Sequence, residues 1–314
     1  MRKRALASEK KMSKYWTLIK STFTEFGKND IFTQAAALAY YTIFSLPPVL
    51  LVILYTTTLF YDEQEVRSII FNEIGDLVGQ ASANQLNTTV SQIGLFDQNW
   101  WASIVGVGTL LFTATTVFVT IQNALNKIFK VKPKPKGLGI LKMLKDRLLS
   151  FAFLLGIAFV LLVSLSVDAF ISAFGNYLSE KLPDISMVIV TLASIVLPFI
   201  MTVFLFTMIF KYLPDIKIEW KDTLVGATIT AVLFSIGKEL IGYYIGNSNV
   251  ANLYDTAGSI MVIMIWVFYA SVIFLFGAVF VYVYGDKIAS GIEPSDYAVE
   301  VIHKEIEMKE ENNY

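Results

Sequence analysis

Long uninterrupted apolar blocks are the feature of this sequence that most restricts its fold. Six such blocks are separated by more polar segments. A helix rises 1.5 Å per residue, so about 20 apolar residues match the roughly 30 Å hydrocarbon core of a bilayer. The chain is also only 16% charged, whereas an average soluble domain is about 25% charged. The sequence therefore predicts an all-α fold, a polytopic membrane helix bundle.

Hydropathy predicts six transmembrane helices, at residues 35–60, 101–124, 148–174, 186–210, 223–245 and 257–284. We accordingly divide the chain into a basic N-terminal segment (1–34), a six-span domain (35–284) and an acidic tail (285–314). The first thirty residues contain no apolar stretch of the kind found in signal peptides, so we expect no cleaved signal peptide. The first span itself is expected to direct insertion.

The distribution of Lys and Arg predicts the orientation of the spans. Eight precede the first span and eight more lie between spans two and three, whereas the loops after spans one, three and five carry only Arg67 and Lys181. Basic loops stay in the cytoplasm. We therefore expect a multi-pass protein of the bacterial inner (plasma) membrane with both termini cytoplasmic.

The segment between spans one and two, residues 62–99, has its own helical pattern. Val66, Ile70 and Ile74 repeat at an interval of four residues, and so do Leu86 and Val90. This spacing predicts an outer amphipathic helical segment of two helices. We expect its apolar stripe to pack on the bundle or lie in the headgroup layer, rather than to form a gate.

The sequence offers little for catalysis or for metal and cofactor binding. It has no Cys, and its single His303 lies in the acidic tail without clustered partners. The common hydrolase, metalloprotease and nucleotide-binding motifs are absent. We therefore expect no catalytic residue, metal or cofactor, and no enzyme. The lysine-rich stretch 131–137 has no interleaved aromatics, which favours contact with membrane lipids over nucleic acid.

Ionisable residues inside the apolar blocks are candidates for function, because each is expensive near the bilayer centre and tends to face the bundle or a wet cavity. They are Asp168 in span three, Lys238 and Glu239 in span five, and Asp255 at the start of span six. All lie in the outer half of the membrane by our topology. We expect Lys238 to pair with Asp168 or Asp255, with snorkelling and a purely structural ion pair as the alternative.

Two further features are candidates for a substrate pathway. Pro47 and Pro48 remove two amide donors within span one, which predicts a kinked or non-helical turn with carbonyls that Ser45, a neighbouring helix or water must satisfy. A polar seam descends span two, and it either lines a path or holds helices together. Its members are Thr113, Thr115, Thr116, Thr120, Gln122, Asn123 and Asn126.

Several sequence blocks together resemble the YihY/BrkB family of bacterial inner-membrane proteins, which has also been called a virulence factor family and ribonuclease BN. The blocks include AAALAYYTIFSLPPVLLVIL, LFTATTVFVTIQNALNKIFKV and YDTAGSIMVIMIWVFYASVIFLFGA. The resemblance implies six spans. Many relatives carry Glu after a late Gly-Ala pair, whereas this chain reads Gly277, Ala278, Val279. A proton or cation role for that acid is therefore not carried over.

These features favour a transporter or exporter of a lipid or another envelope-related solute. A structural or scaffolding protein of the envelope is the alternative, and a ribonuclease is a distant third. An interior polar cavity between Thr113 and Lys238 would favour transport, and a dry bundle would favour the scaffold. The expected partners are membrane lipids and an unknown small solute or lipid, with a homo-oligomer possible.

The topology has a direct test, because the chain has no native cysteine. Single cysteines replace Ser91, Lys134 or Ser248, and intact cells are treated with a membrane-impermeant thiol reagent. We expect labelling at positions 91 and 248 only. Labelling at position 134 alone would reverse the orientation.

Overall fold

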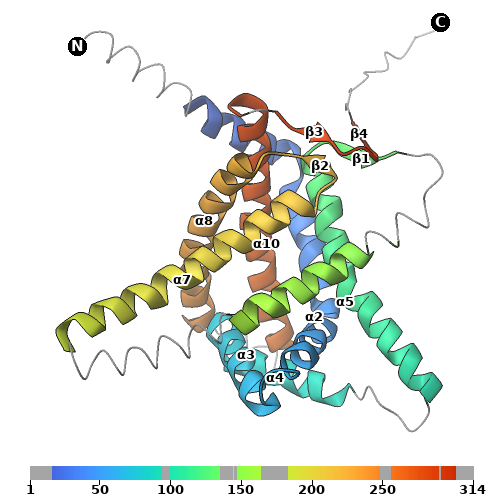
Figure 1. Ribbon diagram of the computed structural model, residues 1–314, viewed down its shortest axis with the longest axis vertical. Coiled ribbons are helices and arrows are strands. Elements are labelled where there is room, and N and C mark those ends of the chain that lie inside the picture. Colours follow the sequence, from blue (N-terminus) through green and yellow to red (C-terminus); the bar gives the residue numbers. More distant parts are fainter. Residues whose placement is uncertain are drawn as a thin grey trace, which may run out of the picture.

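The computed structural model is a bundle of long helices with short strands at one end and a helical hairpin at the other (Figure 1). It describes residues 16–93, 100–134, 144, 147–163, 183–247, 256–289 and 291–301. The long helices are α2 (Ile31–Thr57), α5 (Trp100–Ile128), α7 (Pro183–Tyr212), α8 (Trp220–Asn247) and α10 (Thr256–Lys287). Residues 16–28 and Arg147–Val163 are also helical.

Five helical stretches are long and apolar enough to cross a membrane: Ile31–Thr57, Gly106–Ile128, Val190–Tyr212, Trp220–Ile245 and Ala257–Lys287. They coincide with predicted spans one, two, four, five and six, so the helical membrane bundle is confirmed. Helix Arg147–Val163 begins where span three was predicted, and it is shorter. The rest of that span lies outside the described residues, so the number six stays a prediction.

The predicted amphipathic segment is a helical hairpin, made of α3 (Glu63–Val78) and α4 (Gln80–Gln92). Gly79 joins the two helices with a φ of 85°, a conformation that glycine adopts without a steric penalty. Val66 and Val90 are among its buried residues and belong to a core shared with α2 and α5. The hairpin therefore packs on the bundle, and we call this side of the molecule the hairpin end.

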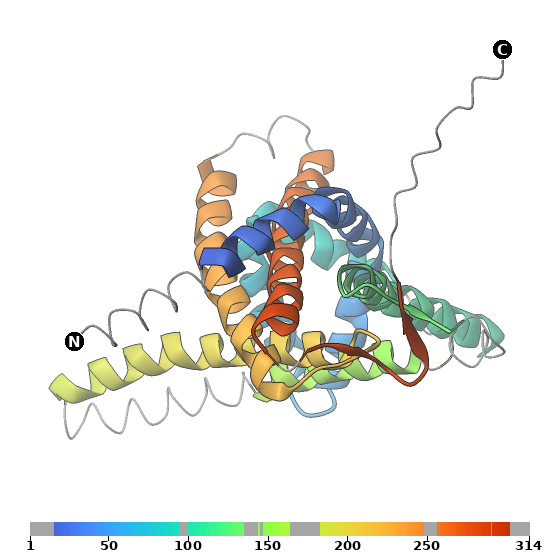
Figure 2. The ribbon, with the colours of Figure 1, turned by 90° about the horizontal axis from the view of Figure 1, so that it is seen from above.

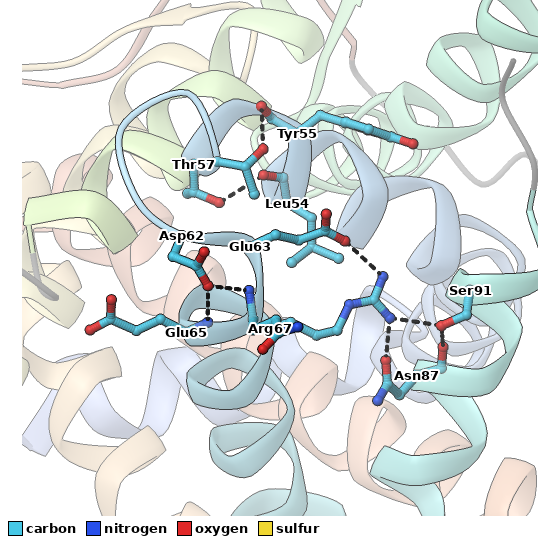
Figure 3. Close-up of polar contacts among 11 residues, drawn as sticks. Leu54, Tyr55, Thr57, Asp62, Glu63, Glu65, Arg67, Asn87 and Ser91 are labelled. Carbon is cyan, nitrogen blue, oxygen red and sulfur yellow. Dashed lines mark hydrogen bonds and ion pairs between the residues drawn. The ribbon is translucent and has the colours of Figure 1, made fainter.

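Arg67 fastens the two hairpin helices to each other (Figure 3). Its Nη1 donates to Asn87 Oδ1 at 2.6 Å and to Ser91 Oγ at 2.7 Å, both on α4. Its Nη2 lies 3.5 Å from Glu63 Oε1 on its own helix. Asp62 caps α3 by accepting the backbone N–H of Gln64 at 2.9 Å. Arg67 thus links α3 to α4 through two side-chain hydrogen bonds.

Four short strands close the opposite side, which we call the strand end. They are β1 (Val131–Pro133), β2 (Ile216–Lys217), β3 (Glu293–Pro294) and β4 (Ala298–Glu300). β1 pairs antiparallel with β4, and β2 pairs antiparallel with β3. The residues after α10 therefore return across the loops that follow α5 and α7. Predicted inside loops and the first part of the acidic tail share one end of the bundle.

An ion pair at the strand end joins the N-terminal helix to the loop after α5. Glu25 Oε2 lies 3.2 Å from Lys130 Nζ. Burial alone would raise the pKa of Glu25, but Lys130 and Lys28 outweigh burial and hold that pKa below its usual value. Burial likewise opposes the charge on Lys130, yet Tyr282 and Glu25 raise its pKa above the usual value. Both groups are therefore held in their charged forms.

The helices pack most closely where α8 meets α10. A Cβ added at Gly277 would lie 2.0 Å from Thr230 Oγ1, and one at Gly226 would lie 2.1 Å from Val281 Cγ2. Such distances leave no room for any side chain, and small residues that let backbones approach are typical of membrane helix contacts. Phe210 and Leu275 are fully buried in the core beside this contact.

Candidate functional site

The threonines of the predicted polar seam in span two make hydrogen bonds within their own helix, α5. Thr113, Thr116 and Thr120 each donate a hydroxyl hydrogen bond to the carbonyl four residues earlier, at 2.8 to 2.9 Å. Such bonds satisfy hydroxyls within a helix without any neighbour. All three side chains are partly exposed.

Arg147, at the start of the helix beside α5, binds the part of this seam around Thr115 and Thr116. Its Nη1 donates to the Phe112 carbonyl and to Thr115 Oγ1, both at 2.9 Å, and to Thr116 Oγ1 at 3.1 Å. The guanidinium carbon lies 3.9 Å from the centre of the Phe112 ring. The threonines therefore hold a cation against α5, so this part of the seam joins helices.

The lower part of the seam leads to a buried carboxylate that the sequence analysis did not single out. Asp215, in the turn after α7, is 2% exposed. Asn126 Nδ2 donates to Asp215 Oδ2 at 3.0 Å, and the Asp215 N–H donates to Asn126 Oδ1 at 2.8 Å. Gln122 Nε2 makes a longer contact of 3.4 Å with Asp215 Oδ1. Asn123, also predicted, is exposed and points elsewhere.

The proline pair does not end the helix of span one. α2 is helical from Ile31 to Thr57 with Pro47 and Pro48 inside it. Ser45 is buried, and its hydroxyl donates to the Tyr41 carbonyl at 2.7 Å rather than to a carbonyl that the prolines leave without a donor. The two prolines therefore do not produce a non-helical turn, whereas a kink within the continuous helix stays a prediction.

Of the predicted charge pair, the structure describes Lys238 but neither of its two candidate partners. Lys238 and Glu239 are both exposed on α8, whereas Asp168 and Asp255 lie outside the described residues, so the pair stays a prediction. Lys238 borders a gap between α8 and α10 that is too small to hold a water. The buried indole N–H of Trp266 also borders this gap, and it has no partner among the described residues.

An apolar groove lies between helix Arg147–Val163 and α7. The two helices run side by side and obliquely to α2 and α10 (Figures 1 and 2). Between them lies a groove of about 600 Å³ with an almost entirely apolar lining. Its walls include Phe153, Gly156, Val160, Ile200, Phe204 and Met208. A Cβ added at Gly156 would meet nothing within 4 Å, so the groove is open at its centre.

The end of the groove at the strand end carries amphipathic and cationic side chains. Tyr212 lines the groove, and its ring meets Trp220 edge-on with ring centres 5.8 Å apart. Both rings are about half exposed. Lys211 lies two helical turns after Phe204 and donates to the Ile218 carbonyl, with its Nζ 5.7 Å from the Trp220 ring centre. Trp, Tyr and Lys in this combination are typical of the boundary between hydrocarbon and headgroups.

Metal binding finds no support in the described part of the chain, where no three His, Asp or Glu residues are grouped suitably. The described residues form two other notable groups. Buried amides and a carboxylate fix the strand end, and apolar side chains line the oblique groove.

Comparisons with known proteins support the conclusion that this chain is a membrane protein. The family model described as virulence factor BrkB matches residues 22–298. A UPF0761 membrane protein of Ralstonia nicotianae is 26% identical over 80% of this chain and 55% of its own length. One of Teredinibacter turnerae is 29% identical over 83% of this chain and 59% of its own length. One of Psychromonas ingrahamii is 25% identical over 80% of this chain and 82% of its own length.

The chain thus spans little more than half the length of the first two of these relatives. No solved structure matches it significantly.

The buried amides make a prediction for stability. Asn126→Ala removes one donor and one acceptor from Asp215, and a buried group left unsatisfied costs about 1–3 kcal/mol. We expect the unfolding temperature in detergent to fall by several degrees. Asn123→Ala is the matched control, because Asn123 is exposed one turn away on the same helix, and it should leave the temperature unchanged. Equal effects of the two substitutions would contradict a structural role for the network.

Proposed function

This chain belongs to the virulence factor BrkB family, and we propose that it is a transporter or exporter of a lipid or lipid-like envelope component. It is a multi-pass membrane protein by its apolar helices and its relatives. We further propose that it acts in the bacterial inner membrane, with the strand end in the cytoplasm, and without enzymatic chemistry. The single observation that carries the proposal is the apolar groove between Arg147–Val163 and α7.

The dimensions of the groove suit one acyl chain. Its lining on the first helix runs from Leu149 to Val163, which is about 20 Å of helix. One leaflet occupies about half of the roughly 30 Å hydrocarbon core. Because the two helices are oblique to the bundle, this length spans about one leaflet. A polar solute would gain little from walls on which Tyr212 is the one polar side chain among the described lining residues.

The chemistry at the mouth suits a phospholipid headgroup. Lys211 supplies a cation, and Tyr212 and Trp220 supply rings that favour the interface. We propose that the acyl chain occupies the groove and that the phosphate lies beside Lys211. The polar seam on α5 is then a structural feature, because its threonines bond to their own helix or to Arg147.

The gap beside Lys238 is too small for water, which by itself favours the scaffolding alternative. Variants of the groove distinguish the two functions, because a scaffold would move no lipid with or without them. Gly156→Leu places a side chain in open space within the groove, so the fold should tolerate it while the acyl chain loses its place. Gly108→Leu is the matched control, since Gly108 is an exposed helical glycine on α5 with nothing within 4 Å and does not line the groove.

The test uses purified protein in vesicles that contain a fluorescent phospholipid, with and without an imposed pH gradient. We expect protein-dependent lipid movement that Gly156→Leu slows by about tenfold, equivalent to about 1.4 kcal/mol, and that Gly108→Leu leaves unchanged. Lipid movement equal to that of protein-free vesicles would favour the scaffold. Movement that ignores both substitutions would remove the groove from the pathway.

A further inference from the structure

The helix formed by residues 16–28 has three distinct faces. One face is buried against the bundle and contains Leu18 and Thr22, at 4% and 1% exposure. A second face is apolar and exposed, with Trp16, Ile19 and Phe23 at 70%, 47% and 62%. These three residues follow one another at intervals of three and four, which places them in one stripe.

The third face of this helix is polar and exposed. It contains Thr17, Lys20, Thr24 and Lys28. At 100° per residue, position 24 lies about 140° around the helix from position 19, so the polar and apolar exposed faces point in different directions. A helix that served only to cover the bundle would need one apolar face, and this helix has an additional one.

Specific contacts fix the orientation of the helix. Glu25 pairs with Lys130 at 3.2 Å, and Lys287 Nζ at the end of α10 donates to Ser21 Oγ at 2.6 Å. Asp30, with a left-handed φ of 48°, makes the turn into α2. The helix therefore lies across the strand end beside α10 (Figure 2), and its exposed apolar stripe has a set direction.

The exposed stripe continues into the apolar surface of the spans. The Phe23 ring lies 5.5 Å from the ring of Phe276 on α10, and Phe26 meets both Phe276 and Phe32 at 5.6 and 5.5 Å. Phe32 is 60% exposed and stacks with Phe268 of α10. The exposed stripe is therefore continuous with an aromatic surface on a helix that is long and apolar enough to cross a membrane.

We propose that residues 16–28 form an interfacial helix whose partner is the lipid surface at the strand end. Trp16, Ile19 and Phe23 enter the boundary between headgroups and acyl chains. Lys20 and Lys28 lie at the level of anionic headgroups, where each basic residue attracts the membrane. The helix thus holds the strand end at a fixed depth, independently of whether the protein transports lipid.

The test exploits the absence of native cysteine. Ile19→Cys and Thr24→Cys each carry a bimane fluorophore in the full chain, reconstituted in bilayers of phosphatidylglycerol and phosphatidylcholine. Both positions are exposed, so neither substitution removes a buried contact. Brominated acyl chains quench from the lipid side and iodide quenches from water.

We expect brominated chains to quench position 19 several-fold more than position 24, and iodide to show the reverse order. Equal iodide quenching at both positions would overturn the proposal, because the stripe would then face water. Protection of position 19 from both quenchers would also overturn it, since another protein or a second copy would then cover the stripe. A thermal unfolding temperature like that of the unlabelled chain confirms that both variants are folded.

Discussion

The buried carboxylate of Asp215 is the interaction on which the strand end depends. A buried polar group is tolerated only with partners, and here the amides of Asn126 and Gln122 come from α5, 89 and 93 positions away along the chain. The Asp215 carbonyl also accepts the backbone N–H of Ser295 at 3.0 Å, next to β3. One residue therefore joins α5, the turn after α7 and the segment after α10.

The position of the groove follows from this junction. α7 ends at Tyr212, three residues before Asp215, so the network fixes the end of α7 that carries Lys211 and Phe204. Arg147 fixes the opposite wall by binding the Phe112 carbonyl and two threonines of α5. Both walls of the groove are thus bonded to the same helix, α5. The space between the walls is lined by apolar side chains. Polar contacts thus hold each wall against α5.

The sequence predicted the parts of this structure that depend on periodicity and length. Apolar length identified the five long spans, and the four-residue spacing of Val66 and Ile70 identified the hairpin. It did not identify Asp215, because this carboxylate lies in a short turn and not inside an apolar block. The amides of Gln122 and Asn126, one turn apart near the end of an apolar block, were the available sign of a buried polar partner. The groove left no sign, since lipid-facing and groove-facing apolar residues have the same composition. A non-helical turn was wrongly expected at Pro47 and Pro48, because the helix continues through both residues.

The central claim is that an acyl chain occupies the groove between Arg147–Val163 and α7. Electron cryomicroscopy of the protein in lipid nanodiscs would test it most directly. We predict a continuous rod of non-protein density between Gly156 and Phe204 that ends in headgroup density beside Lys211. Protein density filling the groove, from this chain or from a second copy, would contradict the account.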